Sequence, residues 1–372
     1  MRLDPVGLHW SELDTPSLLI DIDRMERNIA AMAQRALRAG VRLRPHFKTH
    51  KSLAIAEIQR AGGAEGFTVS KLDEAEVLLE AGFDDVLVTT QLVSQLKLDR
   101  AASLARSGRL VVAVDSIAGV EAISAAGASA GLEFEVSIEV DSGLRRAGVT
   151  SEHVGELAAE ISRSGNVRLH GAFTHAGHAY AASGSAELRA VATEEVATMH
   201  RAAGSAASAG VTLSTLSIGS TPTVLSIDSF SGIHEIRPGN YLFLDRMQVA
   251  LGVASDEDCA LSVAATVMSR PAKERAVVDA GSKSLGLDKG AHGVGTITDY
   301  GQLIGAAGHI SRLSEEHGVL DIPPDSPLQV GDKVRILPNH ACSVANLHRE
   351  YHGLRDEEVE RRIPIDAAGA IH

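Results

Sequence analysis

The sequence predicts an α/β fold, a (β/α)8 TIM barrel followed by a mainly β C-terminal domain. After Gly40, short apolar runs of β character alternate with amphipathic stretches rich in Ala, Leu and Glu, and eight such runs precede residue 250. From about residue 250 the pattern changes to strands separated by turn residues, with few helical stretches. Strands that alternate with helices form a parallel sheet, and eight is the number that closes a barrel.

The eight predicted strands are separated by segments that read as helices ending in glycine, which takes the left-handed conformation at a helix end without strain. A doubly wound open sheet is the alternative, but no GxGxxG motif opens a helix after the first strand. The apolar run 16–23 has no partner among the eight, so we expect it to cross to the second domain. We therefore place the barrel at 24–248 and the β-rich domain at 1–23 plus 249–372. The predicted barrel strands are 41–46, 66–70, 85–90, 110–115, 134–141, 167–175, 212–219 and 234–243.

Composition narrows the class of protein. The chain has 372 residues, of which 44% are hydrophobic and 22% charged, as in a soluble globular protein of two domains. Its net charge of −13 argues against nucleic acid or an anionic membrane as the main partner. The N-terminus does not resemble a signal peptide, and no run approaches the roughly 20 apolar residues of a membrane span. Cys259 and Cys342 are too few for a disulfide framework, so we expect a cytoplasmic protein.

We expect the catalytic and binding residues at the carboxyl ends of the barrel strands, because the loops there converge at one end of the barrel. The first strand ends in PHFKTHK, which contains Lys48. Lysine forms Schiff bases with carbonyl groups, and burial lowers its pKa toward the reactive neutral amine. A lone loop lysine is more often simply solvated. Here, however, His46, His50 and Lys51 surround Lys48, and such a cluster of like charge is costly unless an anion binds there.

A binding site for that anion is predicted at the last two strands. Ser220 and Thr221 follow the seventh strand, and Gly239 and Asn240 lie in the second half of the eighth. Hydroxyls and glycine-exposed backbone N–H groups at these positions bind phosphate in barrels of this kind. Each pair alone could be an ordinary turn. Together with a lysine on the first strand they indicate a phosphate-bearing aldehyde, pyridoxal phosphate.

A second candidate site, for a metal ion, is formed by His340 and Cys342 in the segment LPNHACSV. If this segment is a strand, the two side chains point to the same face. One nitrogen and one sulfur donor favour zinc over magnesium or calcium, and two ligands leave room for water or substrate. The alternative is a buried small cysteine beside a histidine that is satisfied elsewhere. His292 is a weaker candidate and reads as a loop residue.

These motifs also carry a resemblance to a known family. The chain resembles the D-threonine aldolase and metal-dependent D-serine dehydratase family, fold type III pyridoxal-phosphate enzymes that are alanine racemase-like. The similarity runs in chain order from about Thr15 to Asp366. The segments that carry it are RPHFKTHK, DSGLRRAGV, THAGHAY, RPGNY, VDAGSKSLGLDKG and PNHACSVANLH.

The resemblance implies a role for each matched residue. It implies that Lys48 holds the cofactor as an imine, with Arg146 near its ring and Tyr180 near its pyridine nitrogen. It also implies D-β-hydroxy-amino acids as substrates and a homodimer. The residues expected at the cofactor phosphate are Ser220, Thr221, Gly239 and Asn240, and those expected at a divalent metal, zinc or manganese, are His340 and Cys342.

Two reactions fit this site. In retro-aldol cleavage of D-threonine to glycine and acetaldehyde, His175 or His178 removes the hydroxyl proton. In dehydration of D-serine or D-threo-3-hydroxyaspartate, Lys48 removes the Cα proton and the products are a 2-oxo acid and ammonia. Cys342 favours dehydration, because some aldolases of the family carry aspartate there, whereas the segments around the metal pair look more like the aldolases. We favour the aldolase. A pyridoxal-phosphate carrier protein and a barrel for phosphate-bearing sugars are the alternatives from other classes.

Overall fold

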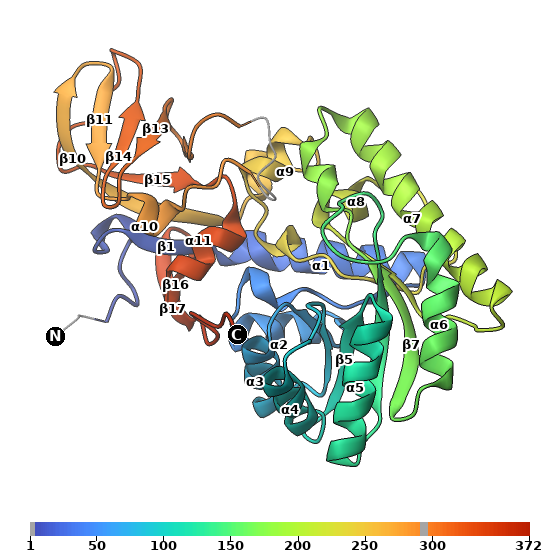
Figure 1. The fold of residues 1–372 in the computed structure, drawn as a ribbon. Coiled ribbons are helices and arrows are strands. Elements are labelled where there is room, and N and C mark those ends of the chain that lie inside the picture. The colour runs from blue at the N-terminus through green and yellow to red at the C-terminus, as the bar shows by residue number, and fades with distance from the viewer. Residues whose placement is uncertain (1–3, 291–296) are drawn as a thin grey trace.

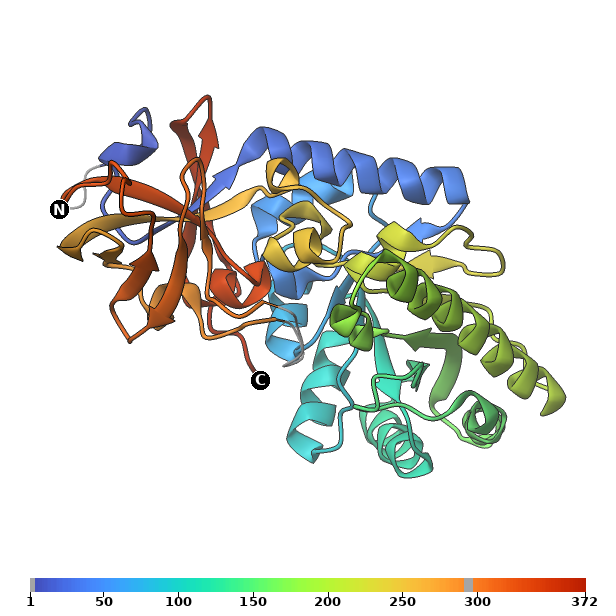
Figure 2. The ribbon, with the colours of Figure 1, turned by 90° about the horizontal axis from the view of Figure 1, so that it is seen from above.

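The computed structural model describes residues 4–290 and 297–372, so His292 lies outside the described residues. The chain forms two sheets, one of eight strands and one of nine (Figure 1). The view from above shows the nine-stranded sheet beside the eight-stranded sheet and its helices (Figure 2). Helix α1 (Ile22–Ala39) begins directly after the first strand. It extends from the smaller unit, which contains the nine-stranded sheet, along the larger unit, which contains the eight-stranded sheet.

The eight-stranded sheet is the predicted barrel. Its order is β2-β9-β8-β7-β6-β5-β4-β3, and every neighbouring pair is parallel. The two ends of this order meet through a parallel bridge between His46 and Thr68, where Thr68 N donates to Pro45 O at 2.8 Å. All eight predicted strands are present, so the predicted fold class is confirmed. The strands are β2 (Arg42–Leu43), β3 (Phe67–Val69), β4 (Asp85–Val88), β5 (Arg109–Val114), β6 (Phe134–Val140), β7 (Val167–Thr174), β8 (Leu216–Ile218) and β9 (Glu235–Ile236).

Helices surround this sheet, and α1 illustrates how the sequence makes them. Asp21 caps its first turn by accepting from Arg24 N, and Gly40 ends it at φ +67°. Its buried residues recur at helical spacing on the face toward the sheet. The other barrel helices are α2 (Leu53–Ala61), α3 (Leu72–Glu80), α4 (Gln95–Leu104), α5 (Ile117–Ala130), α6 (Val154–Arg163), α7 (Ser185–Ser208) and α8 (Thr221–Ser226), with α9 (Arg246–Ala250) after them.

The nine-stranded sheet contains a second, smaller barrel. Six of its strands follow the order β11-β14-β13-β12-β15-β10, and β11 also pairs with β10, so this antiparallel set closes on itself. Strand β1 (Ser17–Asp21) pairs with β10 and β16, which confirms that the run 16–23 crosses to this sheet. The remaining elements are β10 (Leu261–Ala272), β11 (Arg275–Val278), α10 (Ser282–Leu285), β12 (Gln302–Leu303), β13 (His309–Leu313), β14 (Gly318–Asp321), β15 (Lys333–Leu337), α11 (Ala341–Leu347), β16 (Glu350–Arg355) and β17 (Glu358–Pro364).

The predicted strand through LPNHACSV is wrong. Strand β15 ends at Leu337, and His340 is the residue before helix α11. Pro338 has no N–H to continue the ladder, and the chain turns into the helix directly after it. The predicted strand 234–243 is also too long, since β9 ends at Ile236 before Pro238. Both prolines follow a strand and precede a short helical turn that faces the site described below.

No helix among the described residues is long and apolar enough to cross a membrane.

Candidate active site

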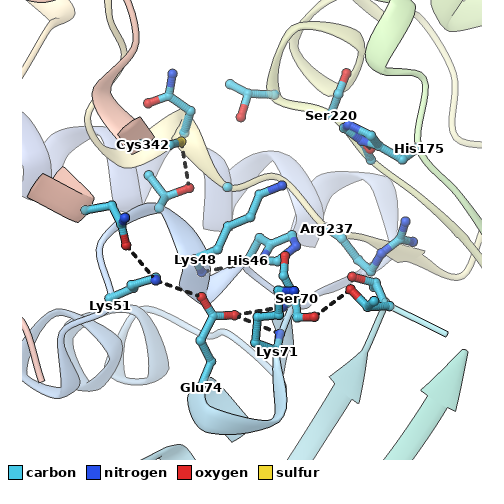
Figure 3. A pocket seen from close by; sticks show the side chains of 18 of the residues that line it. His46, Lys48, Lys51, Ser70, Lys71, Glu74, His175, Ser220, Arg237 and Cys342 are labelled. Carbon is cyan, nitrogen blue, oxygen red and sulfur yellow. Dashed lines mark hydrogen bonds and ion pairs between the residues drawn. The ribbon is translucent and has the colours of Figure 1, made fainter. Parts of the chain in front are cut away.

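A cavity of about 690 Å³ lies where the carboxyl ends of the barrel strands face the smaller unit. It brings together nearly all the predicted site residues, although they come from many parts of the chain. Its walls contain Lys48, Arg146, His175, Tyr180, Ser220, Thr221, Gly239, Asn240, His340 and Cys342. The lysine lies between the Cys342 side of the cavity and the side of His175 and Ser220 (Figure 3).

Lys48 is held by a short 3-10 helix, Phe47–Thr49, that begins directly after β2 and its proline. Burial lowers the pKa of the Lys48 amine, the neighbouring Arg146 lowers it further, and the Cys342 thiolate opposes both. On balance the pKa is lowered, which increases the share of the neutral amine, the form that reacts with an aldehyde. Burial and the neighbouring Lys48 also hold the pKa of His46 well below its usual range. The side chain therefore meets the chemical requirement for an imine-forming lysine.

The cluster of like charge expected around Lys48 is only partly present, because Lys51 lines the cavity and His50 does not. His50 points away, with Nε2 3.0 Å from Gln59 Oε1 and Nδ1 accepting from Ser52 N, and burial lowers its pKa to about 3. Lys51 donates to Asn346 Oδ1 at 2.7 Å and to Ala370 O at 2.9 Å. The sequence argument overestimated the net charge, because it could not show that His50 is turned away or that Lys51 lies 3.5 Å from Glu74 Oε1 in the cavity wall. The case for an anion rests instead on the loops across the cavity.

The predicted phosphate seat is formed by two turns that lie side by side. Gly219, Ser220 and Thr221 follow β8, and Gly239 precedes the 3-10 helix Asn240–Leu242. A Cβ at Gly239 would lie 2.7 Å from Thr49 Oγ1, so glycine is needed for this close approach. Thr221 Oγ1 is buried and has no hydrogen-bond partner among the described residues. An orphaned hydroxyl beside backbone N–H groups at the starts of two helical turns fits a bound phosphate.

Asn240 lines the cavity, but its side-chain amide nitrogen is engaged by Asp245. Its Nδ2 donates to Asp245 Oδ2 at 2.6 Å, so the contribution of Asn240 to an anion would come from its backbone. Asp245 did not stand out in the sequence, because nothing local distinguishes a buried aspartate from an ordinary helix cap.

His175 lies at the end of β7 and lines the cavity. Its Nδ1 is 2.7 Å from Gly219 O. Because a carbonyl only accepts, Nδ1 carries the proton and Nε2 is the nitrogen that can accept one. His178 does not line the cavity within the described chain, and its ring packs on the loop after β6, where a Cβ at Gly143 would lie 2.9 Å from Cε1. Of the two proposed bases, His175 is therefore the one that reaches the cavity.

Arg146 and Tyr180 complete the predicted cofactor contacts. The Arg146 side chain is half exposed and lies 3.7 Å from Glu139 Oε1. Burial and the nearby Cys342 raise the pKa of the Tyr180 hydroxyl far above its usual value, so it stays protonated. Arg237 was not predicted as a site residue, yet it is buried in the cavity wall over the Phe173 ring. Its place at the end of β9 was the only sequence signal.

His340 and Cys342 converge through the first turn of α11 and not through a strand. His340 Nδ1 lies 2.9 Å from Asp288 Oδ2, which leaves Nε2 as the donor toward a metal. Burial opposes a charge on His340, but the Cys342 thiolate and Asp288 outweigh it and raise its pKa to about 10. The same contact with His340 lowers the pKa of Cys342 against the effect of burial.

The donor set fits a divalent metal with two protein ligands. A thiolate is the ligand form of cysteine, and a carboxylate behind a histidine is the usual support for a metal-binding imidazole. No group of three or more His, Cys, Asp or Glu side chains suited to one ion occurs among residues 4–290 and 297–372. Asp288 was missed as a residue, although it lies in the quoted segment VDAGSKSLGLDKG.

Fold and site together define a barrel enzyme of the pyridoxal-phosphate fold type III class. Residues 20–247 match the alanine racemase N-terminal domain family, and residues 260–354 match a putative serine dehydratase domain. The chain belongs to the family that joins these two domains.

Relatives of this family are lyases. D-threo-3-hydroxyaspartate dehydratase of Delftia sp. (strain HT23) is 41% identical over 362 residues, covering 92% of this chain and 94% of the relative. 3-hydroxy-D-aspartate aldolase of Paracoccus denitrificans is 33% identical, covering 98% and 94%. The crystal structure of D-threonine aldolase from Filomicrobium marinum superimposes with a TM-score of 0.92 at 33% identity, covering 100% of both chains.

Two further solved structures are variants of D-threo-3-hydroxyaspartate dehydratase. In one a histidine is replaced by alanine, and in the other, in the metal-free form, a cysteine is replaced by alanine. The two substituted positions are 2 residues apart, the spacing of His340 and Cys342.

Proposed function

We propose that this chain is a pyridoxal-phosphate- and divalent-metal-dependent dehydratase of D-β-hydroxy-amino acids, with D-threo-3-hydroxyaspartate and D-serine as substrates. The observation that carries the proposal is the His340–Cys342 pair beside Lys48. The relative that shares 41% identity is a dehydratase, and its substituted histidine and cysteine have the same spacing. These findings outweigh the segment similarities that favoured the aldolase in the sequence analysis.

The chain's own residues have separate tasks in this reaction. The turns at Ser220 and Gly239 would hold the cofactor phosphate, and Arg146 and Tyr180 would contact its ring. When bound, pyridoxal phosphate supplies an electron sink for the pair left at the substrate Cα. Lys48, whose pKa burial lowers, removes the proton from that Cα.

The β-hydroxyl leaves on the side of His340 and Cys342. When bound there, zinc or manganese supplies a Lewis acid for the departing oxygen. Asp288 keeps the His340 ring in one tautomer and one orientation. Loss of water from the substrate gives an enamine, which hydrolyses to a 2-oxo acid and ammonia.

The second candidate is retro-aldol cleavage, and the position of His175 favours it. Its Nε2 is the proton-accepting nitrogen in the cavity wall, as a base for the β-hydroxyl requires. D-threonine would then give glycine and acetaldehyde. Aldolases are also among the relatives of this chain.

A product assay separates the two reactions. Enzyme loaded with cofactor and metal is incubated separately with D-threo-3-hydroxyaspartate, D-serine and D-threonine, and ammonia, 2-oxo acid, glycine and aldehyde are measured together. Ammonia and oxo acid in equal amounts, lost on chelation, are the expected result. Glycine and aldehyde without ammonia would make the chain an aldolase.

A further inference from the structure

One buried carboxylate, that of Asp245, lies between two parts of the proposed site. One is the turn at Gly239 and Asn240, here called the phosphate turn, and the other is the metal pair, His340 and Cys342. Asp245 is completely buried and follows the phosphate turn by a few residues. Its Oδ2 accepts from Asn240 Nδ2 at 2.6 Å and from the backbone N of Ala341 at 2.9 Å. Ala341 is the residue between His340 and Cys342. A single oxygen atom thus contacts both parts of the proposed site.

The neighbouring backbone supports this connection. Arg246 N donates to Pro338 O at 3.2 Å and Met247 N donates to Asn339 O at 3.3 Å, so this segment lies along the approach to the metal pair. The other carboxylate oxygen of Asp245 accepts from Gln248 N at 3.2 Å and caps α9. With both oxygens engaged, the carboxylate has one orientation.

The residue before Asp245 is in an unfavourable conformation. Leu244 has φ +53°, a region that non-glycine residues rarely adopt, and its N donates to Asn240 O at 2.8 Å. Such conformations persist only where the surrounding structure holds them, and they gather at functional sites. Here the strained turn directs Asp245 from the phosphate turn toward Ala341.

We propose that Asp245 is a positioning residue that couples cofactor binding to metal binding by holding the phosphate turn and the first turn of α11 in one arrangement. This inference rests on the proposed cofactor and metal sites. Asp245 touches neither the substrate nor the metal donors through its side chain. Its contribution is to fix the backbone between His340 and Cys342, so that imidazole and thiolate face one point when the phosphate turn is in place.

The test measures binding and does not depend on catalysis. Pyridoxal phosphate affinity is measured by visible absorbance titration, and Zn²⁺ affinity by competition with a chromophoric chelator, for the wild type and Asp245→Ala. Outer partners of metal ligands typically contribute 10- to 100-fold in affinity. We expect Asp245→Ala to weaken Zn²⁺ binding by about tenfold or more and to weaken pyridoxal phosphate binding in the same protein.

Two other variants keep the test decisive if Asp245→Ala folds poorly. Asp245→Asn retains one oxygen that can accept from both Asn240 and Ala341 but turns its amide nitrogen toward Gln248 N, so the melting temperature should fall while both affinities stay near those of the wild type. Asn240→Ala removes the link from the cofactor side and should weaken Zn²⁺ binding, although Asn240 contacts neither metal donor. Asp21→Ala is the matched control, because Asp21 caps α1 in the same way but lies outside the cavity lining. It should lower the melting temperature and leave both affinities unchanged.

The outcomes separate the inference from the proposed function. A wild type that binds neither cofactor nor metal would overturn both. A wild type that binds both, with an Asp245→Ala variant that loses only thermal stability or only one of the two affinities, would overturn the coupling role alone. Loss of both affinities in Asp245→Ala, and of Zn²⁺ affinity in Asn240→Ala, would support it.

Discussion

Glu195 offers the most direct test of how the barrel positions the site. It lies inside α7 with no exposed surface, and its Oε1 accepts from the backbone N of Ala176 and of Gly219, each at 3.2 Å. Ala176 follows the proposed base His175, and Gly219 begins the other turn proposed to hold the phosphate, the one at Ser220 and Thr221. Glu195→Ala leaves both backbone donors buried without an acceptor. At about 1–3 kcal/mol for each unsatisfied group, the free energy of unfolding should fall by about 2–6 kcal/mol.

The matched control is Glu195→Gln. Burial raises the pKa of Glu195, which favours the neutral acid, and glutamine keeps an oxygen for both donors. Its free energy of unfolding should stay within about 1 kcal/mol of the wild type. Urea unfolding of the cofactor-free protein, followed by circular dichroism, measures both variants. The reasoning is refuted if Glu195→Ala is as stable as the wild type, or if the glutamine variant loses as much as the alanine variant.

Three further predictions concern the lysine, the metal and the barrel. Burial holds the folded pKa of Lys48 below 10.5, so its amine becomes neutral at a lower pH than that of a free lysine. In the cofactor-free protein, the rate at which an amine reagent modifies Lys48 should therefore reach half its maximum below pH 10.5. A midpoint at or above 10.5 would contradict this. At saturating pyridoxal phosphate, chelation should remove lyase activity but leave the visible absorbance of the cofactor, which Lys48→Ala should abolish. Loss of that absorbance on chelation, even at saturating cofactor, would show that the metal holds the cofactor. Arg44→Met breaks a buried pair in which Arg44 Nε lies 2.8 Å from Glu235 Oε2, so the free energy of unfolding in urea should fall by about 3–5 kcal/mol. Arg168→Met, at an exposed pair, should lower it by about 1 kcal/mol or less. Equal losses would refute the burial argument.

The barrel was predictable because its signal is periodic and repeated. Most of the strands are buried on both faces and read as apolar runs, and helices such as α5 end at a glycine with positive φ, here Gly131 at +63°. The assignment of the run 16–23 to the second sheet followed from counting, because it had no partner among the eight strands. These features depend on local sequence and on a general rule of barrel closure.

What sequence could not show depends on tertiary contacts. Proline at 238 and 338 ended strands early, and only the structure shows that the chain then enters helical turns. His50 contacts Gln59 outside the cavity, and Lys51 lines the cavity but is paired with Glu74, so the site carries less positive charge than the sequence suggested. Asp245 is a helix cap by every local criterion, and its contact with Ala341 joins positions 96 residues apart.

The fate of the substrate Cα hydrogen tests the central claim most directly. Dehydration removes it, whereas retro-aldol cleavage breaks the Cα–Cβ bond and leaves it in glycine. The loaded enzyme is given D-threo-3-hydroxyaspartate or D-serine deuterated at Cα, and the products are examined by mass spectrometry. We predict oxo acid and ammonia, with the Cα deuterium released to solvent in step with ammonia. Glycine that retains the deuterium, without ammonia, would contradict the proposed dehydration.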